Sequence, residues 1–219
     1  MRPFLDWGVR LKIIEEIARG ILYIHQDANI NIIHRDLKAA NILLDQNMVP
    51  KISDFGTARL FSGDHVVIAT ETIVGTWGYM SPEYAMGGKM SVKSDVYSFG
   101  VILLEILSGR RNNGNLVLLA DSWRLWQSGN ALKLLDETVS GPFPVQELLR
   151  CIQVGLLCVQ DCPDDRPQMN SVLSMLSGES TALNEPKKPE VCTRICPIQA
   201  HISESHSVMG ITITDLEGR

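Results

Sequence analysis

Residues 34–41 read His-Arg-Asp-Leu-Lys-Ala-Ala-Asn, and residues 54–56 read Asp-Phe-Gly. The stretch between them, residues 42–53, contains two short runs of β-type residues on either side of a polar turn, a pattern typical of a β-hairpin. A hairpin returns the chain on itself, so its outer ends meet. The sequence therefore predicts that Asn41 lies close to Asp54.

Oxygen-bearing side chains at these two bends suit a magnesium-dependent reaction. Mg²⁺ takes hard oxygen ligands and usually relies on one or two carboxylates plus substrate phosphates, so Asn41 and Asp54 are candidate ligands. Asp36 is then a carboxylate that orients a hydroxyl and accepts its proton, while Lys38 places a positive charge on the transferred phosphate. Taken singly, Asp36 also fits a solvated loop acid, Asn41 a turn former and Lys38 a surface charge. Taken together, their order and spacing favour a catalytic site.

The two motifs resemble the catalytic loop and the Asp-Phe-Gly motif of protein kinases. Ser-Pro-Glu at residues 81–83 follows in the position of the family's Ala-Pro-Glu motif. The resemblance implies that Asp36 is the catalytic base and that Asn41 and Asp54 hold Mg²⁺. It also implies ATP as a cofactor, with Leu43 as the lower face of the adenine site. The residues that the resemblance assigns to ATP and metal binding are Lys38, Asn41, Leu43 and Asp54.

The same resemblance implies contacts that hold the catalytic loop in place. Asp95 is expected to bind the backbone of that loop, although a helix-start acid is the simpler interpretation of this residue alone. Arg166 is expected to pair with Glu83. The residues given such structural roles are His34, Arg35, Phe55, Gly56, Glu83, Asp95 and Arg166.

Residues 57–80 form a long polar stretch without periodicity, which the resemblance identifies as the activation segment. Arg35 directly precedes Asp36, and in kinases with this feature a phosphate on the segment pairs with the arginine. We therefore expect phosphorylation at Thr70 or Thr72, with ordinary loop threonines as the alternative. Thr76 resembles the substrate-facing part of the segment.

The expected fold class is mainly α (α+β): the large lobe of a protein kinase with a short β-hairpin at the catalytic loop. Apolar periodicity predicts a helix from an Asp6 cap to about His25 and a nearly all-apolar, buried helix up to a Gly109 cap. Pro167 is expected in the first turn of the last helix. The predicted helices cover approximately residues 7–25, 95–107, 148–159 and 169–176.

The family's small lobe has no counterpart in this sequence. No Gly-x-Gly-x-x-Gly pattern occurs, and the only lysine before Lys38 is Lys12, on a charged helix face. We expect residues 1–178 to be a partial kinase domain, its C-terminal lobe, and residues 179–219 to be a flexible tail. The isolated chain is expected to be weak or inactive as a serine/threonine kinase. The alternative is a non-catalytic fragment that acts as a binding or competitor module.

Several stretches are similar to a narrower group, the plant receptor-like serine/threonine kinases, and the C-terminal residues are similar to those of the S-locus lectin type. The cysteine-rich receptor-like type remains open. Lys38, two residues after Asp36, favours serine/threonine specificity, and Ala40 departs from the serine usual at that position. The resemblance implies a protein substrate and ATP as partners, other receptor-like kinases as further candidates, and a place on the cytoplasmic side of a plasma-membrane receptor.

Composition sets broad limits on the function. Hydrophobic residues make up 45% and charged residues 21% of the chain, as in soluble globular proteins. A formal net charge of -5 gives no support for binding nucleic acid or an anionic membrane. The five cysteines lack metal-ligand spacing, so we expect reduced thiols and a cytoplasmic chain without zinc. No apolar run reaches transmembrane length, and the N-terminus lacks a signal-peptide pattern.

Overall fold

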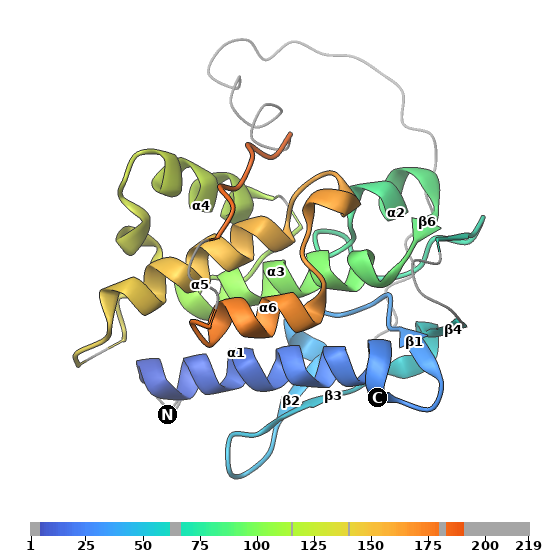
Figure 1. The fold of residues 1–219 in the computed structure, drawn as a ribbon, viewed down its shortest axis with the longest axis horizontal. Coiled ribbons are helices and arrows are strands. Elements are labelled where there is room, and N and C mark those ends of the chain that lie inside the picture. The colour runs from blue at the N-terminus through green and yellow to red at the C-terminus, as the bar shows by residue number, and fades with distance from the viewer. Residues whose placement is uncertain (1–4, 62–66, 115, 140, 180–182, 191–219) are drawn as a thin grey trace.

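A computed structural model describes residues 5–61, 67–114, 116–139, 141–179 and 183–190, and Figure 1 shows its helices gathered around α3. The helices are α1 (Trp7–Leu22), α2 (Pro82–Gly87), α3 (Val92–Ser108), α4 (Val117–Gln127), α5 (Val145–Cys158) and α6 (Met169–Leu176). The strands are β1 (Asn31–Ile33), β2 (Ile42–Leu44), β3 (Pro50–Ile52), β4 (Arg59–Phe61), β5 (Ile68–Ala69) and β6 (Lys89–Met90). They form three antiparallel two-stranded sheets, β1–β4, β2–β3 and β5–β6. This arrangement confirms the mainly α fold class.

Helix α3 is the buried centre of the fold, as its apolar sequence predicts. Ser91 and Ser94 form a reciprocal capping box at its start, and Gly109 ends it with a left-handed backbone conformation. Gly100 lets α3 lie close to α5, because a Cβ atom there would stand 2.6 Å from the Cβ of Cys158. The central helix therefore depends on glycine at a packing contact as well as at its end.

Helix α1 lies along one side of this core and leads toward the catalytic loop (Figure 1). The carboxylate of Asp6 accepts a hydrogen bond from the backbone N–H of Val9 at 2.9 Å, which confirms the predicted N-cap. The helix then widens into a π-helical turn over Tyr23–Asp27. Such turns are frequent at functional sites, and this one places His25 in the buried interior.

Two of the three small sheets were not expected from the sequence. The β2–β3 hairpin is confirmed, with Ile42 opposite Ile52. Residues 57–80, predicted to lack regular structure, instead contribute β4 and β5, which pair with β1 and β6. Strands of two or three residues carry too little pattern to be recognised. Pairing fixes the beginning of this segment, through β4, and its middle, through β5, to the lobe.

The expected position of Pro167 is wrong. Helix α6 begins at Met169 with Gln168 as its N-cap, so Pro167 precedes the cap instead of occupying the first turn. The helix-start role of proline is filled nearby by Pro163, which opens the short 3-10 turn Pro163–Asp165. Both prolines lie after the end of α5 at Cys158, in the connection that leads to α6.

Residues 183–190, part of the predicted tail, make specific contacts with the lobe. The side-chain amide of Gln160 donates to the carbonyl of Lys187 at 3.1 Å and accepts from its N–H at 3.0 Å. Pro186 and Pro189 are buried against the lobe. The remainder of the predicted tail, residues 191–219, lies outside the described residues. We call residues 183–190 the C-terminal strap.

None of the helices in the described ranges combines the length and the hydropathy that crossing a membrane requires.

Candidate active site

Asp95 of α3 holds the backbone of residues 34–35. Its two carboxylate oxygens accept hydrogen bonds from the N–H groups of His34, at 2.8 Å, and Arg35, at 3.0 Å. The Nε2 atom of His25 lies 2.9 Å from the same carboxylate. All of these groups are buried, where hydrogen bonds to a carboxylate are strong. Asp95 therefore makes the expected backbone contact, and Arg35 is held with a φ of 74°.

The imidazole of His34 joins the catalytic loop to the hairpin end. Its Nε2 atom donates to the carbonyl of Ser53 at 3.0 Å, and its Nδ1 atom accepts from the N–H of Asp36 at 3.3 Å. Its ring also contacts that of Phe55, with centroids 4.8 Å apart. These partners fix the proton on Nε2. His34 thereby links the backbone N–H of Asp36 to the backbone of Ser53, the residue before Asp54.

Asp36 lies at the centre of a three-residue polar cluster. One carboxylate oxygen accepts from the hydroxyl of Thr76 at 2.6 Å, and the other lies 2.9 Å from the Nζ of Lys38. Lys38 also donates to the Thr76 hydroxyl at 2.8 Å. The structure thus brings the expected base, the expected cation and the substrate-facing threonine together. Each pair of the three is joined by a hydrogen bond.

The hairpin brings Asn41 to Ser53, the residue before Asp54, because the N–H of Ser53 donates to the carbonyl of Asn41 at 2.9 Å. The Nδ2 of Asn41 donates to the backbone carbonyl of Asp36 at 2.9 Å. Its Oδ1 has no hydrogen bond from a described residue. Asp54 is exposed, and its backbone has the left-handed conformation, with a φ of 65°.

The side chains of Asn41 and Asp54 fit a Mg²⁺ site whose remaining ligands come from a bound substrate. An amide oxygen and an exposed carboxylate are hard ligands, and phosphate oxygens and waters complete such sites. Within the described ranges, no three His, Cys, Asp or Glu side chains gather closely enough to hold a metal alone. Leu43, the expected adenine contact, is 55% exposed. Gly56 follows Asp54 and Phe55 in a short 3-10 turn.

Arg35 connects the catalytic loop to the activation segment. Its guanidinium donates to the hydroxyl of Tyr84, at 2.6 Å from Nη2, and to the carbonyl of Thr72 at 3.1 Å. The Tyr84 hydroxyl in turn donates to the carbonyl of Val74 at 2.9 Å. The hydroxyl of Thr70 donates to the carbonyl of Thr72 at 3.2 Å. Both candidate phosphosites therefore lie in the loop that contacts Arg35.

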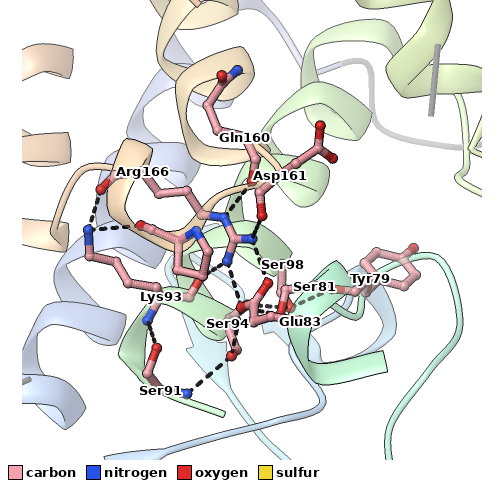
Figure 2. A network of polar contacts seen from close by, with 11 residues as sticks. Tyr79, Ser81, Glu83, Ser91, Lys93, Ser94, Ser98, Gln160, Asp161 and Arg166 are labelled. Atoms are coloured by element: carbon pink, nitrogen blue, oxygen red, sulfur yellow. Dashed lines mark hydrogen bonds and ion pairs between the residues drawn. The ribbon is translucent and has the colours of Figure 1, made fainter. Parts of the chain in front are cut away.

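Arg166 is buried below the end of the activation segment, and Figure 2 shows the surrounding network. Its guanidinium binds both carboxylate oxygens of Glu83, at 2.8 and 2.7 Å, as expected. The other donors reach the carbonyls of Gln160, Lys93 and Asp161 at 2.7, 2.9 and 3.0 Å. Burial acts to raise the pKa of Glu83, but the hydrogen bond and charge of Arg166 outweigh it and leave that pKa below its usual range.

A second buried network holds the segment just after Thr76. The hydroxyl of Tyr79 donates to the carboxylate of Glu105 at 2.9 Å, and the backbone N–H of Asn112 donates to the same group at 2.5 Å. The side-chain amide of Asn112 donates to the carbonyl of Gly78 at 2.9 Å. Burial raises the pKa of Glu105. The pKa of Tyr79 is also raised, first by burial and then by the charge of Glu105.

The sequence interpretation missed several of these residues. His25, Tyr84, Glu105 and Asn112 carry no motif of their own, and each binds a partner far away in sequence. One signal was present: Glu105 interrupts the most apolar helix of the chain. A buried carboxylate needs partners, so this position could have been marked as polar and functional.

The comparison with known families decides the identity of this site. The family described as "Protein kinase domain" matches residues 4–175 of the chain. The chain belongs to the protein kinase family. The kinase motifs at residues 34–41, 54–56 and 81–83 all lie inside the matched range.

The chain is also similar to plant receptor kinases. It is 54% identical over 211 residues to the receptor-like serine/threonine-protein kinase SD1-7 of Arabidopsis thaliana, which covers 92% of this chain and 25% of that protein. It is 47% identical to the G-type lectin S-receptor-like serine/threonine-protein kinase SRK of the same species, covering 98% of this chain and 28% of that protein. The chain thus spans about a quarter of the length of these relatives.

Proposed function

We propose that this kinase lobe transfers phosphate from ATP to serine or threonine hydroxyls of proteins, as part of a receptor-like kinase. The observation that carries this proposal is the cluster of Asp36, Lys38 and Thr76, with the candidate metal ligand Asn41 bound to the backbone of Asp36. Bound Mg²⁺–ATP supplies the phosphoryl group and charge neutralisation. Catalysis by the chain itself is then a matter of positioning and electrostatics.

Each side chain has a distinct part in this mechanism. Asp36 accepts a hydrogen bond from the incoming hydroxyl and receives its proton, in the place where it now accepts from Thr76. Lys38 faces the same carboxylate and offers its charge to the phosphate. Asn41 and Asp54 would hold Mg²⁺ through their side-chain oxygens, and Leu43 would offer an exposed apolar surface to adenine.

We propose further that the activation segment is regulated by phosphate at Thr72. Its carbonyl lies 3.1 Å from a buried arginine nitrogen, whereas its side chain is exposed. A phosphate there could form charge-assisted hydrogen bonds with Arg35. Thr70 is the second candidate, since its hydroxyl is already engaged with the Thr72 backbone.

We propose that a longer receptor would supply the small-lobe motifs that this sequence does not contain. We propose that it works on the cytoplasmic side of the membrane and acts on protein substrates, with other receptor-like kinases among its partners. For the isolated chain we propose very weak ATP binding, because the sequence has no glycine-rich loop to cover the phosphates. The exposure of Leu43 supports the lack of an upper surface at the adenine site.

The direct test is transfer of radiolabelled phosphate to a protein substrate. The 219-residue chain should show negligible turnover, and a chimera that joins it to the small lobe of SD1-7 should show turnover. Asp36→Asn in the chimera should reduce the rate by roughly two or more orders of magnitude, as loss of a catalytic base does. Clear Asp36-dependent turnover by the chain alone would contradict the proposed inactivity, and a chimera insensitive to Asp36→Asn would contradict the assigned base.

A binding or competitor module is the second candidate function. The substrate-facing residues 76–79 are fixed by the Asp36 cluster and the Glu105 network, neither of which needs a small lobe. Such a preorganised surface can bind substrate without catalysis. Capture of a kinase substrate by the chain, without turnover, would favour this function.

A further inference from the structure

The C-terminal strap buries every third of its residues. Leu183 is half-buried and packs against the hydrophobic core, Pro186 and Pro189 are buried, and the residues between them are exposed. The strap is neither a helix nor a strand. A burial period of three residues matches the polyproline II helix, which has three residues per turn, and differs from the periods of the α-helix and the β-strand. The strap thus contacts the lobe in the manner of a polyproline II segment.

The backbone of the strap is held by two glutamine side chains. The amide of Gln153 donates to the carbonyl of Asn184 at 3.0 Å. The amide of Gln160 donates to the carbonyl of Lys187 at 3.1 Å and accepts from its N–H at 3.0 Å. A polyproline II segment makes no hydrogen bonds of its own, so its backbone groups are open to such partners. The lobe therefore binds the strap through its backbone at successive turns.

The spacing of the two glutamines matches the repeat of the strap. Gln153 lies in α5 and Gln160 follows its end, and seven residues of helix correspond to a rise of about 10 Å. Asn184 and Lys187 are one polyproline II turn apart, which corresponds to about 9 Å. Because these two lengths are similar, each glutamine can reach one turn of the strap.

The side-chain contacts of the strap favour one kind of sequence. Pro186 and Pro189 are buried three residues apart, and proline fixes φ near the polyproline II value, so the segment loses little conformational entropy when it binds. The Nζ of Lys187 lies 2.6 Å from the carboxylate of Asp165. The sequence that suits this surface is therefore a proline, a lysine, any residue and a second proline.

Gln160 and Asp161 each contact the strap with the side chain and Arg166 with the backbone. The Asp161 carboxylate accepts the N–H of Glu190 at 2.6 Å. The carbonyls of Gln160 and Asp161 accept from the guanidinium of Arg166 at 2.7 and 3.0 Å, as Figure 2 shows. The same guanidinium binds the carboxylate of Glu83. Binding of the strap therefore restricts the two carbonyls that help to fix the Glu83–Arg166 pair.

We propose that the lobe surface beneath the strap is a recognition site for a polyproline II segment of the form Pro-Lys-x-Pro, where x is any residue. Residues 186–189 of the chain itself occupy this site, and their binding stabilises the Glu83–Arg166 pair. Such coupling is reciprocal: release of the strap loosens the pair, and loss of the pair loosens the strap. The side chains that form the site are those of Gln153, Gln160, Asp161 and Asp165.

The first test measures binding of a separate peptide to the site. The probe is fluorescein-labelled Leu-Asn-Glu-Pro-Lys-Lys-Pro-Glu, the sequence of residues 183–190, and the readout is fluorescence anisotropy. The full chain with Pro186→Asp and Pro189→Asp, which cannot bury its strap, should bind the peptide saturably. The unmodified chain should bind at least about tenfold more weakly, because its own strap competes at high effective concentration. Absence of saturable binding, or equal binding by the two chains, would overturn the proposed site.

The second test measures how often the strap is released in the full chain. Trypsin cleavage between Lys187 and Lys188, followed by mass spectrometry, reports the released population. Gln160→Ala should speed this cleavage about tenfold, because two hydrogen bonds to the strap are lost. Gln146→Ala, which alters an exposed glutamine near the start of α5, is the matched control and should leave the rate unchanged. Slow hydrogen exchange of the α3 amides shows that the opening is local. An unchanged rate for Gln160→Ala would overturn the assigned contact.

Glu83→Gln tests the coupling to the activation segment. This change weakens the pair with Arg166 without altering the strap, so the same cleavage should become about fivefold faster. Glu137→Gln, which alters an exposed carboxylate, is the control and should have no effect. An unchanged rate for folded Glu83→Gln, or equal acceleration in both variants, would overturn the coupling. Neither experiment depends on phosphoryl transfer, so both apply whether or not the chain is catalytically active.

Discussion

At the scale of single residues, Arg166 shows how one side chain can organise several segments. Its guanidinium has five N–H donors, and five acceptors surround it: two carboxylate oxygens of Glu83 and three backbone carbonyls. It is almost fully buried. Buried ion pairs add little net stability when complete, but removing part of one is costly.

Lysine should not replace this arginine. Arg166→Lys keeps a positive charge but offers three donors instead of five, so buried acceptors lose their partners. We expect a loss of about 3 kcal/mol in the free energy of unfolding, measured by urea denaturation. Arg124→Lys is the matched control, since Arg124 forms an exposed pair with Asp121 and should change stability by less than about 1 kcal/mol. Similar losses in the two variants would contradict the assignment.

The chemistry of the catalytic loop could be read from the sequence because short motifs carry its donors and acceptors. The partners Asp36, Asn41 and Asp54 are close along the chain or joined by a hairpin. The contacts of Tyr84 and Asn112 could not be read in this way. They depend on how the activation segment and the loop after α3 fold over the lobe, which no local pattern records.

At the scale of elements, the contact between α3 and α5 depends on two glycines. A Cβ added at Gly100 would lie 2.6 Å from Cys158 Cβ and 3.0 Å from the carbonyl of Gly155. Backbone cannot yield as a flexible side chain can. The long helices were predictable from apolar periodicity and caps, whereas this close approach, like the short strands of the activation segment, was not.

Gly100→Ala should therefore destabilise the lobe although alanine is the better helix former. Overpacking of this kind costs about 1–3 kcal/mol, and a lower midpoint of urea unfolding should report it. Gly87→Ala in α2 is the control, because nothing lies within 4 Å of an added Cβ there. That change should be neutral or slightly stabilising. An unchanged midpoint for Gly100→Ala would show that the helices can separate without cost.

At the scale of the whole molecule, the Glu83–Arg166 pair links the activation segment, α3 and the end of α5, so its titration should affect global stability. The folded-state pKa of Glu83 is lowered. The stability it contributes is therefore fully present above its unfolded pKa and is lost as the pH falls through the folded pKa. Most of this change should occur in acid, below the usual range of a glutamate.

This prediction is tested by urea unfolding at a series of pH values for the unmodified chain and Glu83→Gln. The stability difference between them should be largest near neutral pH and should shrink as the pH falls through the acid range. Glu179→Gln, which alters an exposed carboxylate shortly after α6, serves as the control and should give a flat difference. A constant difference for Glu83→Gln would contradict the linkage.

Gln160 has a mechanical consequence for the same assembly. Its side-chain amide holds both the N–H and the carbonyl of Lys187, as a neighbouring strand would, while its own carbonyl accepts from Arg166. The contact with Gln160 uses only backbone atoms of residue 187, while the side chain of Lys187 makes a separate ion pair with Asp165 at 2.6 Å. A pull along the C-terminal strap would thus reach Arg166 by one route through Gln160, and from there Glu83 at the end of the activation segment, beside the routes through Gln153, Asp161 and Asp165.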